Sequence, residues 1–180
     1  GEYALADSTA DLSEFPPERR ARMANYYAKN PRQQINGLIA HEFVHTQQQP
    51  IPGYLYGQSL YEGVAEFVSC LATGERPDQS VQYGLEHADG VLAVFSKEMF
   101  NTWNRSKWLW SNAPNVFNQR DLGYYVGYAV CDAIYEAAGD KSAAIDRLVN
   151  INYADTNAVE AIFDESNLLP ATFAELRQHY

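Results

Sequence analysis

Cysteine and long apolar runs are both scarce in this sequence, and each scarcity limits what the protein can be. The two cysteines, Cys70 and Cys131, lie inside apolar segments and are interpreted as small buried residues, so they leave the redox compartment open. No stretch approaches the ~20 consecutive apolar residues that a membrane-spanning helix needs. We therefore expect no membrane span in this chain.

The start of the chain also lacks two features. It opens on Gly1 rather than on methionine, and no basic segment followed by an apolar one stands at its head. We expect a trimmed chain that has lost a signal peptide, a lipid anchor or an N-terminal domain before residue 1. This expectation favours a secreted, periplasmic or lipid-anchored location over the cytoplasm.

Positive charge is the third shortage. The sequence has 13 Lys and Arg against 23 Asp and Glu, a formal net charge of -10. This balance repels phosphate backbones and anionic lipid, and no basic stripe is present to bind them, so nucleic acid is excluded as a partner. The 180 residues, 46% of them hydrophobic, suffice for one core and contain no internal repeat. Residues 1–180 are therefore predicted to form a single domain.

Helix signals dominate the chain, so the predicted fold is mainly α. Residues 2–9 alternate loosely in polarity and predict one short N-terminal strand, and residues 103–119, rich in tryptophan, are expected to form a loop. N-cap residues, helix-start prolines, terminal glycines and apolar spacing predict helices over residues 16–30, 30–49, 59–74, 120–139, 141–151, 157–163 and 170–180, and a long, less regular helical region over 77–103.

The five residues HEFVH, from His41 to His45, carry the clearest chemical signal. Residues four apart share one helix face, so both imidazoles can reach one ion at zinc-ligand distances of ~2.0 to 2.1 Å. Glu42 is turned off that face and is free to take a proton from an activated water, which is the mechanical reason for the HExxH pattern of zinc hydrolases. The alternative is a pair of ordinary core or surface histidines. With four histidines in the chain, we interpret the pattern as a metal site.

A catalytic zinc site usually has a third protein ligand. The sequence after His45 is TQQQ, which excludes the H-x-x-G-x-x-H extension of metzincins. The next carboxylate is Glu62, seventeen residues after His45 on a separate predicted helix. Glu62 also fits a capping box with Ser59, in which it would fold back onto the helix start instead.

The segment YEGVAEF resembles the NEG-A-x-(F/Y) segment of gluzincins, the thermolysin and aminopeptidase clan. The resemblance implies that Glu62 is the third ligand and that Glu66, one turn on, contacts a histidine ligand behind the metal and steadies its ring. The spacing differs, because the better-known gluzincins have about two more residues before the glutamate. Glu66 as the ligand in place of Glu62 therefore stays open.

A wider resemblance covers most of the chain. IAHEFVHTQQ, YEGVAEFVS and DLGYYVGYAVCDAIY are together similar to bacterial predicted zinc-dependent proteases that are related to the gliding-motility lipoprotein B family. These proteins carry an HE-x-x-H-x-x-x-Q, an EG-x-A-E and a GY-x-x-GY segment in the same order. The resemblance implies a zincin-like α+β domain in which the HExxH helix packs on a second, glutamate-bearing helix.

Peptide hydrolysis also needs a donor for the oxyanion. Arg120, Tyr124 and Tyr128 recur at i, i+4 and i+8 of one predicted helix and are the candidates, although tyrosines on an apolar helix are also common core residues. Gly123 and Gly127 beside them predict a close approach of backbone or ligand, because glycine otherwise weakens a helix.

Together with the resemblance to gluzincins, these residues predict a zinc metallopeptidase of that type, which binds one Zn²⁺, uses Glu42 as general base and acts on peptides or proteins. One alternative is a zincin fold without turnover that serves as a binding or assembly module. Another is a metal-free helical structural domain.

Overall fold

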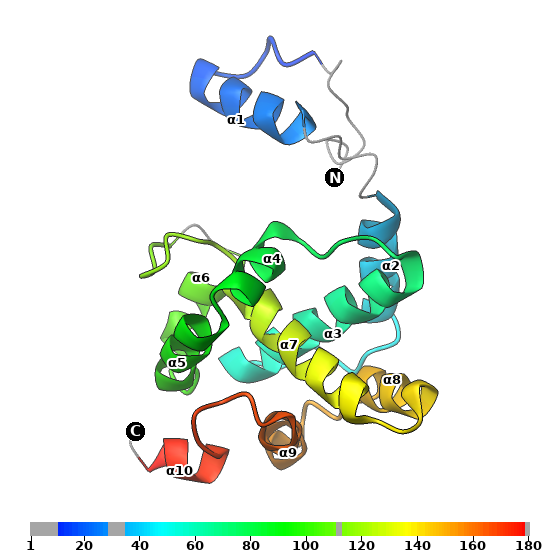
Figure 1. Cartoon of the computed structure of the whole chain (residues 1–180). Helices are drawn as coiled ribbons and strands as arrows, with labels where there is room; N and C mark the ends of the chain where they lie inside the picture. The colour runs from blue at the N-terminus through cyan, green and yellow to red at the C-terminus, as the bar shows by residue number, and fades with distance from the viewer. Residues whose placement is uncertain (1–10, 29–34, 111–112, 179–180) are drawn as a thin grey trace.

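A computed structural model describes residues 11–28, 35–110 and 113–178, and within these ranges every regular element is a helix (Figure 1). The mainly α prediction is confirmed, whereas the strand predicted at residues 2–9 lies outside the described residues. The helices are α1 (Pro17–Ala28), α2 (Ile35–His45), α3 (Leu55–Thr73), α4 (Gln79–Glu86), α5 (Ala88–Glu98), the 3-10 helix η3 (Thr102–Asn104), α6 (Arg105–Trp108), α7 (Leu122–Ala137), α8 (Lys141–Val149), α9 (Thr156–Ser166) and α10 (Phe173–Arg177).

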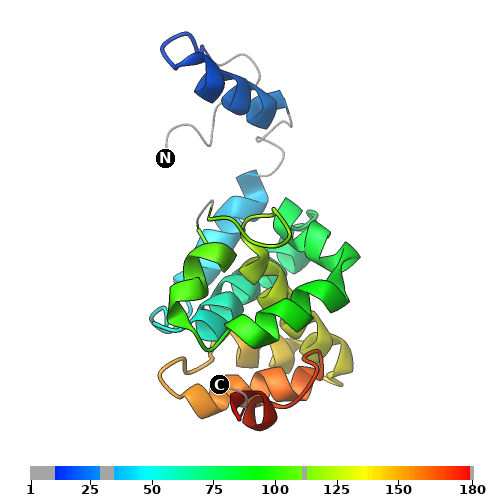
Figure 2. The ribbon, with the colours of Figure 1, turned by 90° about the vertical axis from the view of Figure 1, so that its left-hand side faces the viewer.

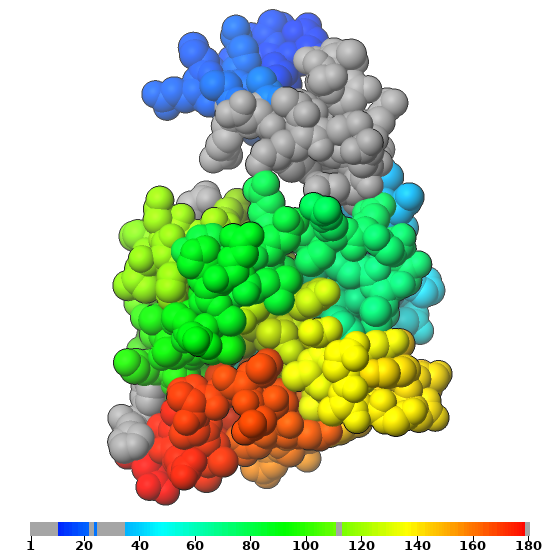
Figure 3. All heavy atoms as spheres, viewed as in Figure 1, coloured from blue at the N-terminus to red at the C-terminus, as the bar shows by residue number. Residues whose placement is uncertain are grey.

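Helix α7 occupies the centre of the fold and packs most extensively against α3. Figure 1 shows α4 and α5 on one side of α7, α8 beside its C-terminal end, and α9 below it. The fully buried core is built from apolar residues at helical spacing, such as Leu60 and Val64 of α3 and Val126 and Val130 of α7. In the space-filling view, α3 to α10 form one continuous body (Figure 3).

The α3–α7 contact depends on two glycines that face each other. A Cβ on Gly127 would lie 1.9 Å from the carbonyl oxygen of Ser59, and a Cβ on Gly63 would lie 2.1 Å from the carbonyl carbon of Gly127. Both distances are shorter than any real contact, so the backbones touch where no side chain fits. The close approach predicted for Gly127 is thus made by the backbone of α3.

Several predicted helix boundaries are wrong. Helix α3 begins at Leu55 rather than at residue 59, although it ends as predicted, at Gly74 in the left-handed conformation (φ 69°). Helix α2 ends at His45 rather than at residue 49, because the following turn leads into Pro50, and residues before proline avoid the helical conformation. The long, less regular helical region predicted over 77–103 contains α4 and α5, which are separated at His87, and the predicted 103–119 loop contains α6 and most of η3.

Helix α2 lies at the edge of the molecule and packs on α3. It buries only His41 and Val44, while Leu38, Ile39 and Phe43 are 46%, 61% and 65% exposed. Helix α1 stands apart from the other helices, beyond the start of α2, in both views (Figures 1 and 2). Among the described residues, no helix combines the length and the apolar character needed to cross a membrane.

Candidate metal centre

Three donor atoms from α2 and α3 converge on one point. The Nε2 atoms of His41 and His45 are 3.1 Å apart, and the Glu62 Oε2 atom lies 3.4 Å from the first and 3.3 Å from the second. A tetrahedral ion with ligands at ~2.0 to 2.1 Å separates its ligand atoms by about 3.3 to 3.4 Å. The triangle therefore has the size of three corners of such a site, and these three side chains could hold a metal ion.

The outer nitrogen of each imidazole is occupied by a different oxygen. His41 Nδ1 lies 3.2 Å from Glu66 Oε2, and His45 Nδ1 lies 2.6 Å from Gln48 Oε1. If each Nδ1 donates its proton to that oxygen, each Nε2 presents its lone pair to the centre of the triangle. In that protonation state, two lone pairs and the carboxylate of Glu62 cannot satisfy one another, whereas a cation at the centre, or a proton on an inner nitrogen, can.

Electrostatics at this point favour opposite charges on the two helices. Burial lowers the pKa of His41, but hydrogen bonds to Glu62 and Glu66 outweigh it and raise the pKa to about 9. Burial likewise raises the pKa of Glu62, but hydrogen bonds from His41 and His45 bring it down to about 2. The carboxylate thus stays ionised and attracts positive charge to the centre of the triangle.

Glu66 is itself held in place from α4. Its Oε1 atom accepts a hydrogen bond from the backbone N–H of Asp78, at 2.6 Å, while Oε2 faces His41. The two oxygens of one carboxylate therefore connect the start of α4 to the imidazole on α2. In this geometry Glu66 contacts the outer nitrogen of His41, and Glu62 faces the inner nitrogens of both histidines.

Aromatic rings cover both imidazoles. Tyr61 stacks on His45, with ring centroids 4.5 Å apart and 7° between the planes, and Tyr124 stacks on His41 at 6.0 Å and 26°. The hydroxyl of Tyr124 accepts a hydrogen bond from Trp110 Nε1 at 3.1 Å. Burial and the charge of Glu62 raise the pKa of Tyr124 well above its ordinary value, so this hydroxyl stays protonated and can donate.

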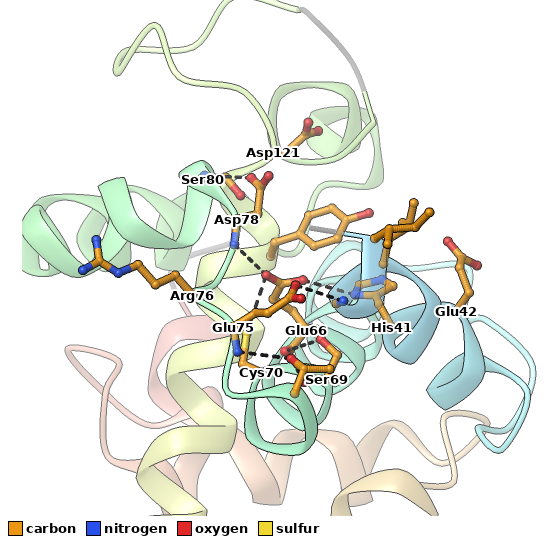
Figure 4. A pocket seen from close by; sticks show the side chains of 15 residues that line it. His41, Glu42, Glu66, Ser69, Cys70, Glu75, Arg76, Asp78, Ser80 and Asp121 are labelled. Carbon is orange, nitrogen blue, oxygen red and sulfur yellow. Dashed lines mark hydrogen bonds and ion pairs between the residues drawn. The ribbon is translucent and has the colours of Figure 1, made fainter. Parts of the chain in front are cut away.

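A pocket of about 330 Å³ opens beside this triangle, between α2, α3 and the start of α4. Its wall includes His41, Glu42, Glu66 and Tyr124, but not His45 or Glu62. In the view of Figure 4, Glu42 lies on the other side of His41 from Glu66. Among the described residues, no donor makes a hydrogen bond to the exposed carboxylate of Glu42.

The prediction that Arg120, Tyr124 and Tyr128 share one helix face is wrong for Arg120, whereas Tyr124 and Tyr128 both lie on α7, four residues apart. Arg120 precedes α7 and is followed by Asp121 in the left-handed conformation (φ 60°), so the helical repeat does not extend to it. Its side chain is 55% exposed and pairs with Asp121. Tyr128 packs on Phe67, with ring centroids 5.4 Å apart, and does not line the pocket.

The capping-box alternative for Glu62 is wrong. Since α3 begins at Leu55 with Tyr54 as N-cap, Ser59 is already inside the helix, and Glu62 lies further in, too far from the helix start to cap it. The carboxylate instead faces α2.

Sequence reasoning missed Gln48, Tyr61 and Trp110. Gln48 had a usable signal, because it follows His45 by three residues, a spacing at which side chains meet on a helix or its last turn. The wider resemblance pointed instead to position 49, where Gln49 is exposed. The contacts of Tyr61 and Trp110 depend on how separate helices pack, which spacing does not encode.

No family model, curated protein or solved structure matches the chain. The relation to gluzincins therefore stays a prediction from the sequence.

Proposed function

We propose that the protein is a zinc-dependent hydrolase of peptide bonds, of the gluzincin type. One observation carries this proposal: His41, His45 and Glu62 direct three donor atoms to one point at tetrahedral spacing, while Glu66 and Gln48 occupy the outer imidazole nitrogens. Histidine with oxygen partners on its outer nitrogens is the usual arrangement of zinc ligands.

The donor set favours zinc over other common ions. Two imidazole nitrogens and one carboxylate oxygen are the ligands of many catalytic zinc sites, whereas calcium and magnesium prefer oxygen alone. When bound, zinc supplies Lewis acidity that lowers the pKa of water toward ~7 and polarises a carbonyl group. Three protein ligands leave one position for water or substrate, as hydrolysis requires.

Proton transfer falls to Glu42. Its carboxylate is exposed on the pocket wall, next in the chain to His41, and no described residue makes a hydrogen bond to it. Glu42 takes the proton of the attacking water and passes it to the departing amine. Tyr124 also lines the pocket, and its protonated hydroxyl can donate to the negative oxygen that develops on the substrate.

Metal analysis and peptide hydrolysis test the proposal together. We expect one zinc per chain in the purified protein and loss of stoichiometric zinc in His45→Ala, since two ligands cannot hold the ion. Glu42→Gln should keep its fold and its zinc but lose hydrolysis of a mixed peptide library, because the amide cannot accept the proton. Glu136→Gln, an exposed carboxylate on α7, is the matched control and should behave as the unmodified protein.

The outcomes separate the alternatives. Full zinc occupancy in His45→Ala would remove the assigned site. Zinc without hydrolysis in the unmodified protein would favour a binding or assembly module, and absence of zinc a metal-free structural domain.

A further inference from the structure

The pocket beside the candidate metal centre is lined by carboxylates that have no assigned part in hydrolysis. Besides Glu42 and Glu66, it is lined by Glu75, Asp78 and Asp121. Apart from His41, the only basic side chain among its described lining residues is the exposed Arg76, which Figure 4 shows pointing away from the pocket. The pocket as a whole is therefore acidic.

Two of these carboxylates have structural partners that leave their charge in place. Glu75 Oε2 accepts the backbone N–H of Gly37, near the start of α2, at 3.0 Å. Asp78 Oδ1 accepts the backbone N–H of Ser80 at 2.9 Å and caps α4. Both contacts stabilise helix starts, but a neutral amide does not cancel a full negative charge. These two residues alone would need no ligand.

Asp121 behaves differently. It is the N-cap of α7, yet its side chain makes no capping hydrogen bond, because the residue adopts the left-handed conformation. One carboxylate oxygen, Oδ2, pairs with Arg120. The other, Oδ1, is buried and has no hydrogen-bond partner. An aspartate that gives up its usual capping role and keeps a buried oxygen without a donor lacks a structural explanation.

Ser80 provides an independent sign of a missing partner at the same end of the pocket. The residue is only 2% exposed, and its hydroxyl has no hydrogen-bond partner. Figure 4 draws Ser80 and Asp121 beside Asp78, and both residues line the pocket. A hydroxyl turns freely about its single bond, so it can meet a donor that enters there.

Apolar side chains form another part of the wall. Ile35 and Leu38 of α2 line the same pocket as the carboxylates. A lysine or arginine side chain also has an apolar and a charged part: an aliphatic stem, and a cationic end that carries only hydrogen-bond donors. A pocket of about 330 Å³ is large enough for such a side chain, since ligand pockets begin near 300 Å³.

We propose that this pocket binds a lysine or arginine side chain of the peptide substrate, with the cationic end at Asp121, Asp78 and Ser80 and the stem against Leu38. The identity of the ligand as a peptide substrate rests on the proposed function. The cationic group supplies the donors that Asp121 Oδ1 and the Ser80 hydroxyl lack. Because the pocket wall includes His41 and Glu42, the bound side chain belongs to a residue close to the cleaved bond.

General attraction must be separated from this specific contact. A protein with a net charge of -10 attracts every cationic peptide, wherever the charge stands in the peptide. A pocket at a fixed place beside the reaction centre instead favours a cation at one position only. The preference for that position should also fall when one pocket carboxylate is removed and stay unchanged when a distant carboxylate is removed.

The test uses alanine-based peptides that carry a single lysine, or methionine as an uncharged control, at successive positions. Cleavage is measured with the zinc-loaded protein. Binding is measured by fluorescence anisotropy with the full chain carrying Glu42→Gln, so that turnover does not interfere. At one position, lysine should be favoured over methionine by roughly tenfold, the equivalent of one charge-assisted hydrogen bond.

Asp121→Asn is the decisive variant, because asparagine tolerates the left-handed conformation and removes only the charge. It should bring the preference for lysine to within about threefold of methionine, and Ser80→Ala should lower it more modestly. Asp146→Asn, an exposed carboxylate on α8, is the matched control and should keep the full preference.

Each outcome decides the inference. A lysine preference that is the same at every position, or that survives Asp121→Asn, overturns it. Cleavage without lysine preference overturns the inference and leaves the proposed function in place. Absence of cleavage, with lysine binding that is lost in Asp121→Asn, sinks the proposed function and supports the pocket.

Discussion

The ranking of Glu62 and Glu66 gives the sharpest test of the metal centre. Glu62 Oε2 lies 3.4 and 3.3 Å from the two inner imidazole nitrogens, so Glu62→Gln replaces an ionised ligand by a neutral, weaker one. Glu66 Oε2 lies 3.2 Å from the outer nitrogen of His41, so Glu66→Gln leaves all three ligands in place. Loss of such an outer contact typically costs 10- to 100-fold in metal affinity, about 1.4 to 2.7 kcal/mol. Glu62→Gln should exceed that range clearly.

Zinc competition against a chromophoric chelator measures both affinities at a fixed pH. Glu136→Gln serves as the control, because that exposed carboxylate is remote from the ligands and should leave zinc affinity unchanged. Thermal melting of the metal-free proteins checks that both variants fold. If Glu66→Gln weakened zinc more than Glu62→Gln, the ligand assignment would be wrong, and Glu66 would take the place of Glu62 as the third ligand.

Three further predictions concern the hydrogen bond between His45 and Gln48, the protonation of His41 and the close contact between α3 and α7. Gln48→Ala should weaken zinc binding by about 10- to 100-fold in the same titration, since its oxygen fixes the second histidine, whereas Gln49→Ala, at an exposed position, should not. The pKa of His41 in the metal-free protein is raised from 6.5 to about 9, so its contribution to stability is complete below pH 6.5 and is lost as the pH rises through 9. Zinc needs the neutral imidazole, so its binding at pH 7.5 should release about one proton, and calorimetry in buffers of different ionisation enthalpy that finds no release would contradict this. Gly127→Ala should lower the free energy of unfolding by about 1 to 3 kcal/mol or more in denaturant titrations, because its methyl group would lie 1.9 Å from a carbonyl oxygen of α3. Gly139→Ala, with no atom within 4 Å of the new methyl group, should change stability by less than about 0.5 kcal/mol.

The sequence predicts those parts of the site that depend only on the spacing of residues within one helix. The i, i+4 repeat of His41 and His45 holds within one helix, so both side chains face α3 as the pattern requires. The repeat that joined Arg120 to Tyr124 failed because one residue between them, Asp121, leaves the helical conformation. Asp121 is the N-cap of α7, a position that aspartate favours, so the helix begins after Arg120 and its periodicity does not extend back to that residue.

The remaining features depend on contacts between distant segments. The start of α3 at Leu55 includes YGQS, which contains no strong N-cap before Ser59, and burial of that first turn against the core decides its conformation. The partners of Glu66 come from α2 and from the backbone of Asp78. Single-sequence reasoning can propose that Glu66 steadies a histidine, but it cannot place the amide that fixes the carboxylate.

Because α2 buries few of its residues, we expect it to unfold locally before the helices that pack around α7. This helix buries only His41 and Val44, and its contact with α3 includes the three polar side chains that would hold the proposed ion. Without an ion, the contacts of His41 with Glu62 and Glu66 still hold α2 on α3, but a bound ion adds its binding free energy to the docked state. Amide hydrogen exchange should therefore speed up along α2 first when zinc is removed, while the α3–α7 pair, joined backbone to backbone, stays protected. In such a protein the concentration of free zinc sets the local unfolding equilibrium of one helix, independently of the stability of the rest.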